Sequence, residues 1–130
     1  MKKLVCAGLV ICLMAAMSLT VYAGSTTRTG TTSGGLYGTA NTSAALNVTA
    51  YMASGTTSTY GTLTNITYGT TVTITYLNYL GHTESKSGSG TSSAGVSVTN
   101  AMNVLSAVSQ HTVNGGSYWG TWNCTITGQP

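Results

Sequence analysis

Length, composition and charge set the first limits on this chain. Its 130 residues suffice for about one domain, and its formal net charge is +3 with one carboxylate side chain, Glu84, and no Asp. Glycoside hydrolysis ordinarily needs two carboxylates, and a Ser-His-Asp triad needs an acidic member, so neither reaction is expected. Phosphate-binding and dinucleotide-binding glycine patterns are also missing from the sequence. We therefore expect a protein that is not an enzyme and holds no cofactor.

The first 23 residues have the features of a secretory signal peptide. Lys2 and Lys3 precede an apolar run, Leu4–Met17, and Val21-Tyr22-Ala23 places small residues where a signal peptidase reads them. The run is too short for a comfortable membrane span, although an uncleaved anchor is the alternative. We expect cleavage after Ala23, secretion to the extracellular space or cell surface, and no stable membrane span afterwards.

Residues 24–130 would form the mature protein. Thr, Ser and Gly make up about half of it, and its charged side chains are Arg28, Glu84 and Lys86. No basic patch remains for nucleic acid. Cys124 would be the one remaining cysteine, and its alternation with Trp122 predicts a buried thiol, with intermolecular pairing as the alternative.

The N-terminal half of the mature chain begins with a polar stretch, residues 24–35, for which we expect a flexible segment followed by the domain over 36–130. Short strands are expected at 36–40 and 44–53, with a turn at Ser54–Thr57. A further strand at 58–68 is interrupted by Gly61, which favours an edge or bulged position.

The stretch Tyr68–Tyr79 has the clearest strand pattern in the chain. Apolar and polar side chains alternate along it, as in a half-buried strand. One phase contains Val72, Ile74, Tyr76 and Leu80, and the other contains Thr71, Thr73, Thr75 and Tyr79. We expect the first phase to face a core and the second to face solvent or a partner.

The C-terminal half continues in the same way. Residues 81–93 are expected to form a long surface loop, followed by strands at 94–99, 104–113 and 117–127, with a tight hairpin turn at Asn114-Gly115-Gly116. About seven short strands separated by turns, with no convincing helix, are typical of an antiparallel β-sandwich. The predicted fold class is therefore an all-β antiparallel sandwich after an N-terminal signal peptide helix.

His111 could take part in either of two reactive arrangements, a metal site or a thiol–imidazole pair. His82 and Glu84 with His111 would supply three metal ligands, although His111 is remote in the sequence. Cys124 and His111 lie on the two arms of one predicted hairpin and would form a thiol–imidazole pair if their side chains met. For both arrangements a structural, hydrogen-bonded His111 is the favoured interpretation, and no metal site is expected.

The aromatic segment Tyr118–Trp122 is the best candidate for a binding surface. Trp119 and Trp122 are three residues apart, so a regular strand would place them on opposite faces, one in the core and one exposed. An exposed Trp with Tyr118, Tyr79, Tyr37 and Tyr51 would form a stacking platform for a glycan, a peptide or a cell-wall component. The alternative is that these rings fill the core, because the chain has no Phe.

The segment His111–Trp119 (HTVNGGSYW), together with Tyr76–Tyr79 and Val96–Thr99, resembles small secreted Ser/Thr/Gly-rich all-β proteins of Gram-positive gut bacteria. That resemblance implies secretion and a β-rich fold, and the group has no established activity. The chain is also similar to the lactococcin-972-type bacteriocins, which implies an antagonistic role. Three hypotheses follow: extracellular binding, bacteriocin-like antagonism, and self-assembly through edge strands of low charge.

Overall fold

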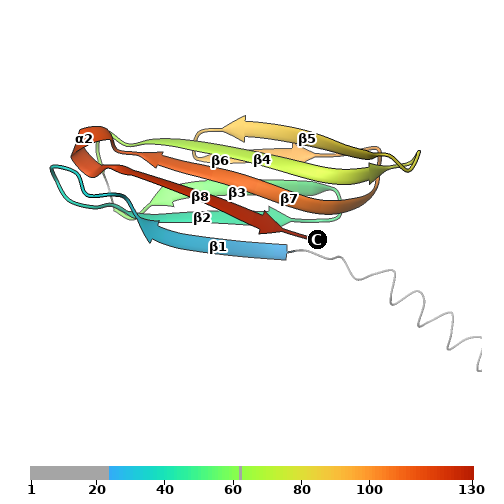
Figure 1. Ribbon diagram of the computed structural model, residues 1–130, viewed down its shortest axis with the longest axis horizontal. Coiled ribbons are helices and arrows are strands. Elements are labelled where there is room, and N and C mark those ends of the chain that lie inside the picture. The colour runs from blue at the N-terminus through green and yellow to red at the C-terminus, as the bar shows by residue number, and fades with distance from the viewer. Residues whose placement is uncertain (1–23, 62) are drawn as a thin grey trace, which may run out of the picture.

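The alternating pattern of the sequence becomes two packed sheets. A computed structural model describes residues 24–61 and 63–130 (Figure 1), and the predicted signal peptide lies outside the described residues. The eight strands are β1 (Gly24–Thr31), β2 (Asn41–Val48), β3 (Met52–Thr59), β4 (Thr67–Asn78), β5 (Thr83–Gly90), β6 (Ser93–Ser97), β7 (Ala101–Asn114) and β8 (Thr121–Gly128). The predicted all-β antiparallel sandwich is confirmed, with eight strands in place of about seven.

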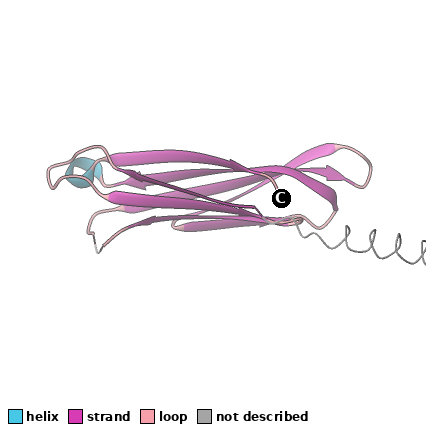
Figure 2. Ribbon diagram, turned by 90° about the horizontal axis from the view of Figure 1, so that it is seen from below, coloured by secondary structure: helices cyan, strands magenta, loops and turns pink. Residues whose placement is uncertain are grey.

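Each sheet has four strands, and every pairing is antiparallel. The order in one sheet, called sheet I, is β1-β2-β3-β6, and the order in the other, called sheet II, is β5-β4-β7-β8. The chain passes between the sheets after β3, β5 and β6. Viewed from the side, the two layers lie one above the other along their whole length (Figure 2).

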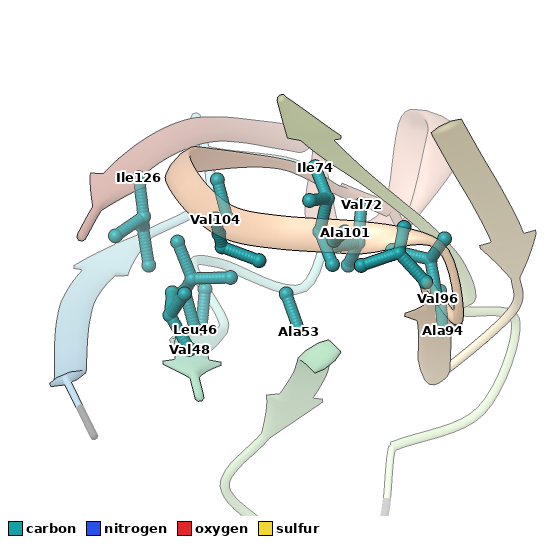
Figure 3. Close-up of a cluster of buried hydrophobic side chains, with 13 residues drawn as sticks. Leu46, Val48, Ala53, Val72, Ile74, Ala94, Val96, Ala101, Val104 and Ile126 are labelled. Atoms are coloured by element: carbon teal, nitrogen blue, oxygen red, sulfur yellow. The ribbon is translucent and has the colours of Figure 1, made fainter. Parts of the chain in front are cut away.

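The core lies between the two inner faces. Sheet I contributes small and branched side chains such as Leu46, Val48 and Val96, and sheet II contributes Val72 and Ile74, which are fully buried. Figure 3 shows these side chains meeting in the space between the sheets. Burying a Val or Ile side chain contributes about 1.5–3 kcal/mol each, so this alternation supplies the main driving force for folding.

Strand β4 confirms most of the pattern predicted for Tyr68–Tyr79. Val72 and Ile74 are buried and Tyr76 packs against the core, whereas Thr71, Thr73 and Thr75 are on the outer face. Leu80 does not follow its predicted phase. It lies beyond the end of β4 and is exposed, because the chain turns after Asn78.

The flexible segment predicted at 24–35 is wrong for its first eight residues. Gly24–Thr31 forms β1, which pairs with β2 along its whole length. Its inward positions are Gly, Thr and Arg, so no apolar alternation marks the strand in the sequence. Residues 36–40 do not form the predicted strand, because Gly35 and Gly38 close a tight turn on Leu36 and Tyr37.

The strand predicted at 44–53 is two strands. The backbone turns at Thr49, where the Thr49 N–H donates to the Met52 carbonyl at 2.7 Å and the Met52 N–H donates to Thr49 Oγ1 at 3.2 Å. The turn predicted at Ser54–Thr57 is therefore inside β3, and most of the strand predicted at 58–68 is the connection between β3 and β4.

The loop predicted at 81–93 contains β5, an edge strand. Its inward positions include Glu84, Lys86 and Gly88, so it has no buried apolar row, and backbone pairing with β4 holds it in place. Lys86 Nζ donates to the Ser97 carbonyl of β6 at 2.8 Å, which ties the two sheets together at this edge.

The hairpin of β7 and β8 is confirmed by their pairing, but its connection is longer than a two-residue turn. A short helix, α2 (Gly116–Trp119), intervenes before β8 starts at Thr121. Gly116, the first residue of α2, and Gly120, which follows the helix, have φ values of 55° and 74°, a region that glycine adopts without strain. Strand β8 therefore begins at Thr121, four residues after the start predicted at residue 117.

Candidate functional site

Three aromatic rings gather at the end of the sandwich that carries α2. The rings of Tyr37 and Tyr118 are stacked, with centroids 5.0 Å apart and planes 16° apart. The Trp119 ring is tilted by 58° against Tyr37, at a centroid distance of 5.7 Å. Such offset and tilted arrangements are the ones that aromatic pairs favour. We call these three residues, with the loops 32–40, 63–66 and 115–120, the aromatic end.

Backbone hydrogen bonds fix the Tyr37 loop against α2. The Leu36 N–H donates to the Ser117 carbonyl and the Tyr37 N–H donates to the Tyr118 carbonyl, each at 2.9 Å. Gly35 is required for this contact, because a Cβ there would overlap the carbonyl group of Tyr118. The stacked pair therefore joins segments that are about 80 residues apart in the sequence.

Trp119 connects a third loop to the same end. Its indole N–H donates to the Thr64 carbonyl at 3.0 Å, and the Trp119 side chain is half-buried. Figures 1 and 2 place α2 at one extreme of the molecule, where the connections between β1 and β2 and between β3 and β4 also lie. Tyr37 remains 64% exposed in this arrangement, so its ring is available for contact with a ligand.

The prediction that Trp119 and Trp122 point to opposite faces of one strand is wrong, because Trp119 belongs to α2 and not to a strand. Trp122 lies in β8, is half-buried and packs against the core. A Cβ on Gly30 would collide with its indole nitrogen, so the Trp122 ring lies directly against the backbone of β1. Trp122 is thus a packing residue between the edges of the two sheets.

Tyr79 does not join the aromatic end. It lies in the turn between β4 and β5, at the opposite end of the sandwich, and is 66% exposed. Of the four residues predicted to bind, the structure therefore brings Tyr118 and Trp119 together and leaves Trp122 and Tyr79 apart.

The sequence predicts Tyr37 only as an additional ring of the platform, and it does not predict the contacts made by Leu36 and Thr64. The signal available was the segment Gly34-Gly35-Leu36-Tyr37-Gly38, in which glycines flank two large apolar residues. That pattern indicates a tight turn that displays its side chains. It gives no information on which other loop the turn contacts.

His111 is a buried member of a polar chain between the sheets. It is 1% exposed, and its Nδ1 lies 2.8 Å from Thr57 Oγ1 while its Nε2 lies 2.7 Å from Ser109 Oγ. Thr57 Oγ1 in turn lies 2.7 Å from Thr70 Oγ1, whose hydroxyl donates to the Thr91 carbonyl at 2.7 Å. Each hydroxyl has one proton, so the donors can be assigned along the chain.

That assignment places a proton on Nδ1 of His111. The Thr70 proton is used on a carbonyl, so Thr57 donates to Thr70 and accepts from Nδ1–H of His111. In the neutral imidazole Nε2 then accepts from the Ser109 hydroxyl. Burial lowers the pKa of His111, which agrees with the neutral form. The structural interpretation of His111 therefore fits its geometry.

The two chemical arrangements considered for His111 do not form. Cys124 is its direct cross-strand partner, as the predicted hairpin implies, but both imidazole nitrogens are already bonded to hydroxyls. Burial raises the pKa of the Cys124 thiol, which disfavours the reactive thiolate. His82 and Glu84 are exposed and His111 is in the core, and no cluster of three or more metal-ligating side chains occurs among residues 24–61 and 63–130.

Glu84 serves the turn beside Tyr79. Its carboxylate accepts from the Tyr76 hydroxyl at 2.7 Å and from Asn78 Nδ2 at 2.6 Å. The Tyr76 hydrogen bond is the main reason that the pKa of Glu84 is lowered, followed by the one from Asn78. The carboxylate is thus held ionised by structural partners.

No family model, no curated protein and no solved structure matches the chain. Within the described part of the chain, no helix is long and apolar enough to cross a membrane.

Proposed function

We propose that this chain is a secreted, non-enzymatic binding protein that contacts a glycan, peptide or other cell-wall component through its aromatic end. One observation carries the proposal: the exposed rings of Tyr37 and Tyr118 and the half-buried ring of Trp119 form a surface cluster, held by stacking, by the indole hydrogen bond and by backbone bonds between its loops. Rings held in place before binding lose little conformational entropy on contact, and this favours affinity.

The surroundings of the cluster support binding without catalysis. The nearest approach to a catalytic pair is Ser109 with His111, and both are fully buried with no carboxylate beside them. The charged side chains Arg28, Glu84 and Lys86 lie on edge strands away from α2. Recognition at the aromatic end would therefore use ring faces, hydroxyls and backbone groups.

The positions of the charges favour binding over self-assembly. Arg28 lies on β1 opposite buried Ala44, and Lys86 lies on β5 opposite buried Ile74, so both occupy inward positions of edge strands. Inward-pointing charges on edge strands are a common means of preventing edge-to-edge pairing. A surface protein that works as a monomer fits this arrangement better than a filament subunit.

A pull-down on insoluble Gram-positive cell-wall material tests the proposal. The variant Tyr37→Ala with Tyr118→Ala should bind at least tenfold more weakly than the parent protein, because it removes the stacked pair. A matched control, Tyr51→Ala with Tyr79→Ala, removes two exposed tyrosines at the other end and should bind as the parent does. Equal retention of all three proteins, or no retention of the parent, would overturn the proposal.

A further inference from the structure

A second surface lies at the same end of the sandwich, on the outer face of sheet I. The end of β1, the start of β2 and the residue after β3 form a row across three strands. Thr31 pairs with Asn41, and the Tyr60 N–H donates to the Asn41 carbonyl at 3.0 Å, which continues the ladder by one residue. Side chains opposite one another in neighbouring strands share a face, so a hydroxyl, an amide and a phenol ring stand side by side.

This row borders an open depression of about 590 Å³. Its lining consists of Thr29, Gly30, Thr31, Asn41, Thr42 and Tyr60. None of these residues is charged. Tyr60 is 62% exposed, so its ring stands at the border of the depression and is free to stack on a ligand.

The base of the depression is rigid. Gly30 and Thr42 pair with each other and occupy the inward phase of their strands. The Trp122 ring packs directly beneath Gly30, where a Cβ would collide with it, and Thr42 is fully buried. The backbone under the row is therefore held from below, which fixes the positions from which the three side chains project.

We infer that this row, Thr31–Asn41–Tyr60, binds a neutral oligosaccharide, an inference that rests on the proposed function because it assumes extracellular binding. A pyranose ring has an apolar face that stacks on an aromatic ring and hydroxyls that bond to amides and hydroxyls. Those are the groups that the row presents. Anionic or cationic ligands find no countercharge in the lining.

A peptide fits the row less well. The backbone groups of β2 are paired with strands on both sides, so a peptide cannot add to the sheet at Asn41 by main-chain hydrogen bonds. On the neighbouring edge strand β1, the inward Arg28 opposes strand addition. The lining also contains no Leu, Ile, Val or Met side chain that would form a pocket for an apolar peptide residue. Side-chain recognition of a hydroxyl-rich ligand is what remains.

Calorimetric titration of the protein with cellohexaose, chitohexaose and mannohexaose tests the inference. At least one of these neutral hexasaccharides should bind, with less than a twofold change in affinity between 20 and 500 mM NaCl. Tyr60→Ala should weaken binding at least tenfold and Asn41→Ala at least threefold. Tyr60→Phe keeps the ring and should remain within threefold of the parent, which separates loss of stacking from loss of the hydroxyl.

Several outcomes would overturn the inference. They are the absence of binding to all three hexasaccharides, equal affinity of the parent and Tyr60→Ala, or an affinity that falls steeply with salt. Preferential binding of a wall peptide at Tyr60 would also overturn the inference, because the ligand would then be a peptide and not an oligosaccharide. If Tyr37→Ala with Tyr118→Ala loses wall binding while Tyr60→Ala keeps it, this inference fails and the proposed function stands. If wall binding survives loss of the stacked tyrosines, the proposed function fails, and this inference stands only if a hexasaccharide binds and Tyr60→Ala weakens that binding.

Discussion

The two ends of the sandwich carry similar side chains in different states. Exposed large apolar residues gather toward the ends and leave the outer faces to Thr, Ser and Asn. The aromatic end displays Leu36, Tyr37 and Tyr118, with Tyr60 on the neighbouring surface, and the other end displays Tyr51, Met52, Tyr79, Leu80, Met102 and Leu105. We call the second group, with the turns 49–51, 79–82 and 98–100, the turn end.

Hydrogen bonds stabilise different groups at the two ends. At the turn end, Asn78 Oδ1 accepts from the Leu80 and His82 N–H groups, each at 2.9 Å, and this shapes the turn without fixing the Tyr79 ring. At the aromatic end, backbone bonds hold the loops together, and ring stacking and the Trp119 indole hydrogen bond restrain the rings. The difference teaches that exposure alone does not make a binding surface, because a ligand gains most from groups that are already positioned.

The largest expected effect comes from two matched glycines. Gly120 and Gly81 both have positive φ, but a Cβ on Gly120 would overlap the Ser33 carbonyl oxygen, whereas a Cβ on Gly81 meets nothing within 4 Å. Gly120→Ala should lower the free energy of unfolding by about 2–4 kcal/mol, from backbone strain and overpacking together. Gly81→Ala should cost about 1 kcal/mol, from strain alone. Urea unfolding measures both, and equal costs would mean that the loops at the aromatic end are not in contact.

Acid should weaken the core that both ends share. The pKa of His111 is lowered by burial in the folded protein, so the unfolded chain binds a proton first as the pH falls below about 6.5. The contribution of neutral His111 to the free energy of unfolding should be fully present above that pH. It should be lost progressively as the pH falls toward the pKa of His111 in the folded protein. The urea midpoint should fall between pH 7.5 and 5, whereas His111→Gln should flatten this dependence. His82→Gln, at the exposed turn end, is the control and should keep it.

A smaller effect is expected from the indole hydrogen bond. Trp119→Phe keeps a ring but leaves the Thr64 carbonyl to water, which should cost about 0.5–1.5 kcal/mol. Hydrogen exchange should become faster in residues 63–66 and stay unchanged in the turn 79–82. Unchanged exchange in 63–66 would show that Trp119 does not hold that loop.

The smallest expected difference is in the stability cost of removing one tyrosine at each end. Tyr37→Ala removes a stacked ring and should cost about 0.5–1.5 kcal/mol of stability. Tyr79 has nearly the same exposure, and Tyr79→Ala should cost less than about 0.5 kcal/mol. Thermal unfolding of the two variants compares them, and a larger cost at Tyr79 would reverse the ranking of the ends.

The sequence predicted the strands that have an apolar inward row. Val72 and Ile74 reveal β4 by their spacing, and both are buried. Strand β7 is predicted from its β-branched residues and the following Asn-Gly turn, and Val104 and Val113 are both buried because the register shifts at Leu105. Strands β1 and β5 were missed because Gly and charged residues occupy their inward positions, so their pairing leaves no hydrophobic period. Edge strands of this kind are held by a neighbouring strand and are not visible in local sequence.

The candidate site was predicted only in part, for a similar reason. Tyr118 and Trp119 stood out by composition, but their contact with Tyr37 depends on loops far apart in the chain. A helical turn replaced the expected strand start because Gly116 and Gly120 permit backbone angles that a regular strand excludes. The row at Tyr60 was missed because residues 58–68 were interpreted as one strand.

Nuclear magnetic resonance mapping compares the two ends in one measurement. Titration of ¹⁵N-labelled protein with solubilised cell-wall fragments should shift the Trp119 indole signal and the amides of residues 35–38 and 117–119. The amides of the turns 49–51 and 79–82 should stay in place. Shifts confined to the turn end, or none at the aromatic end with a fragment that binds, would contradict the assignment of binding to the fixed aromatic cluster.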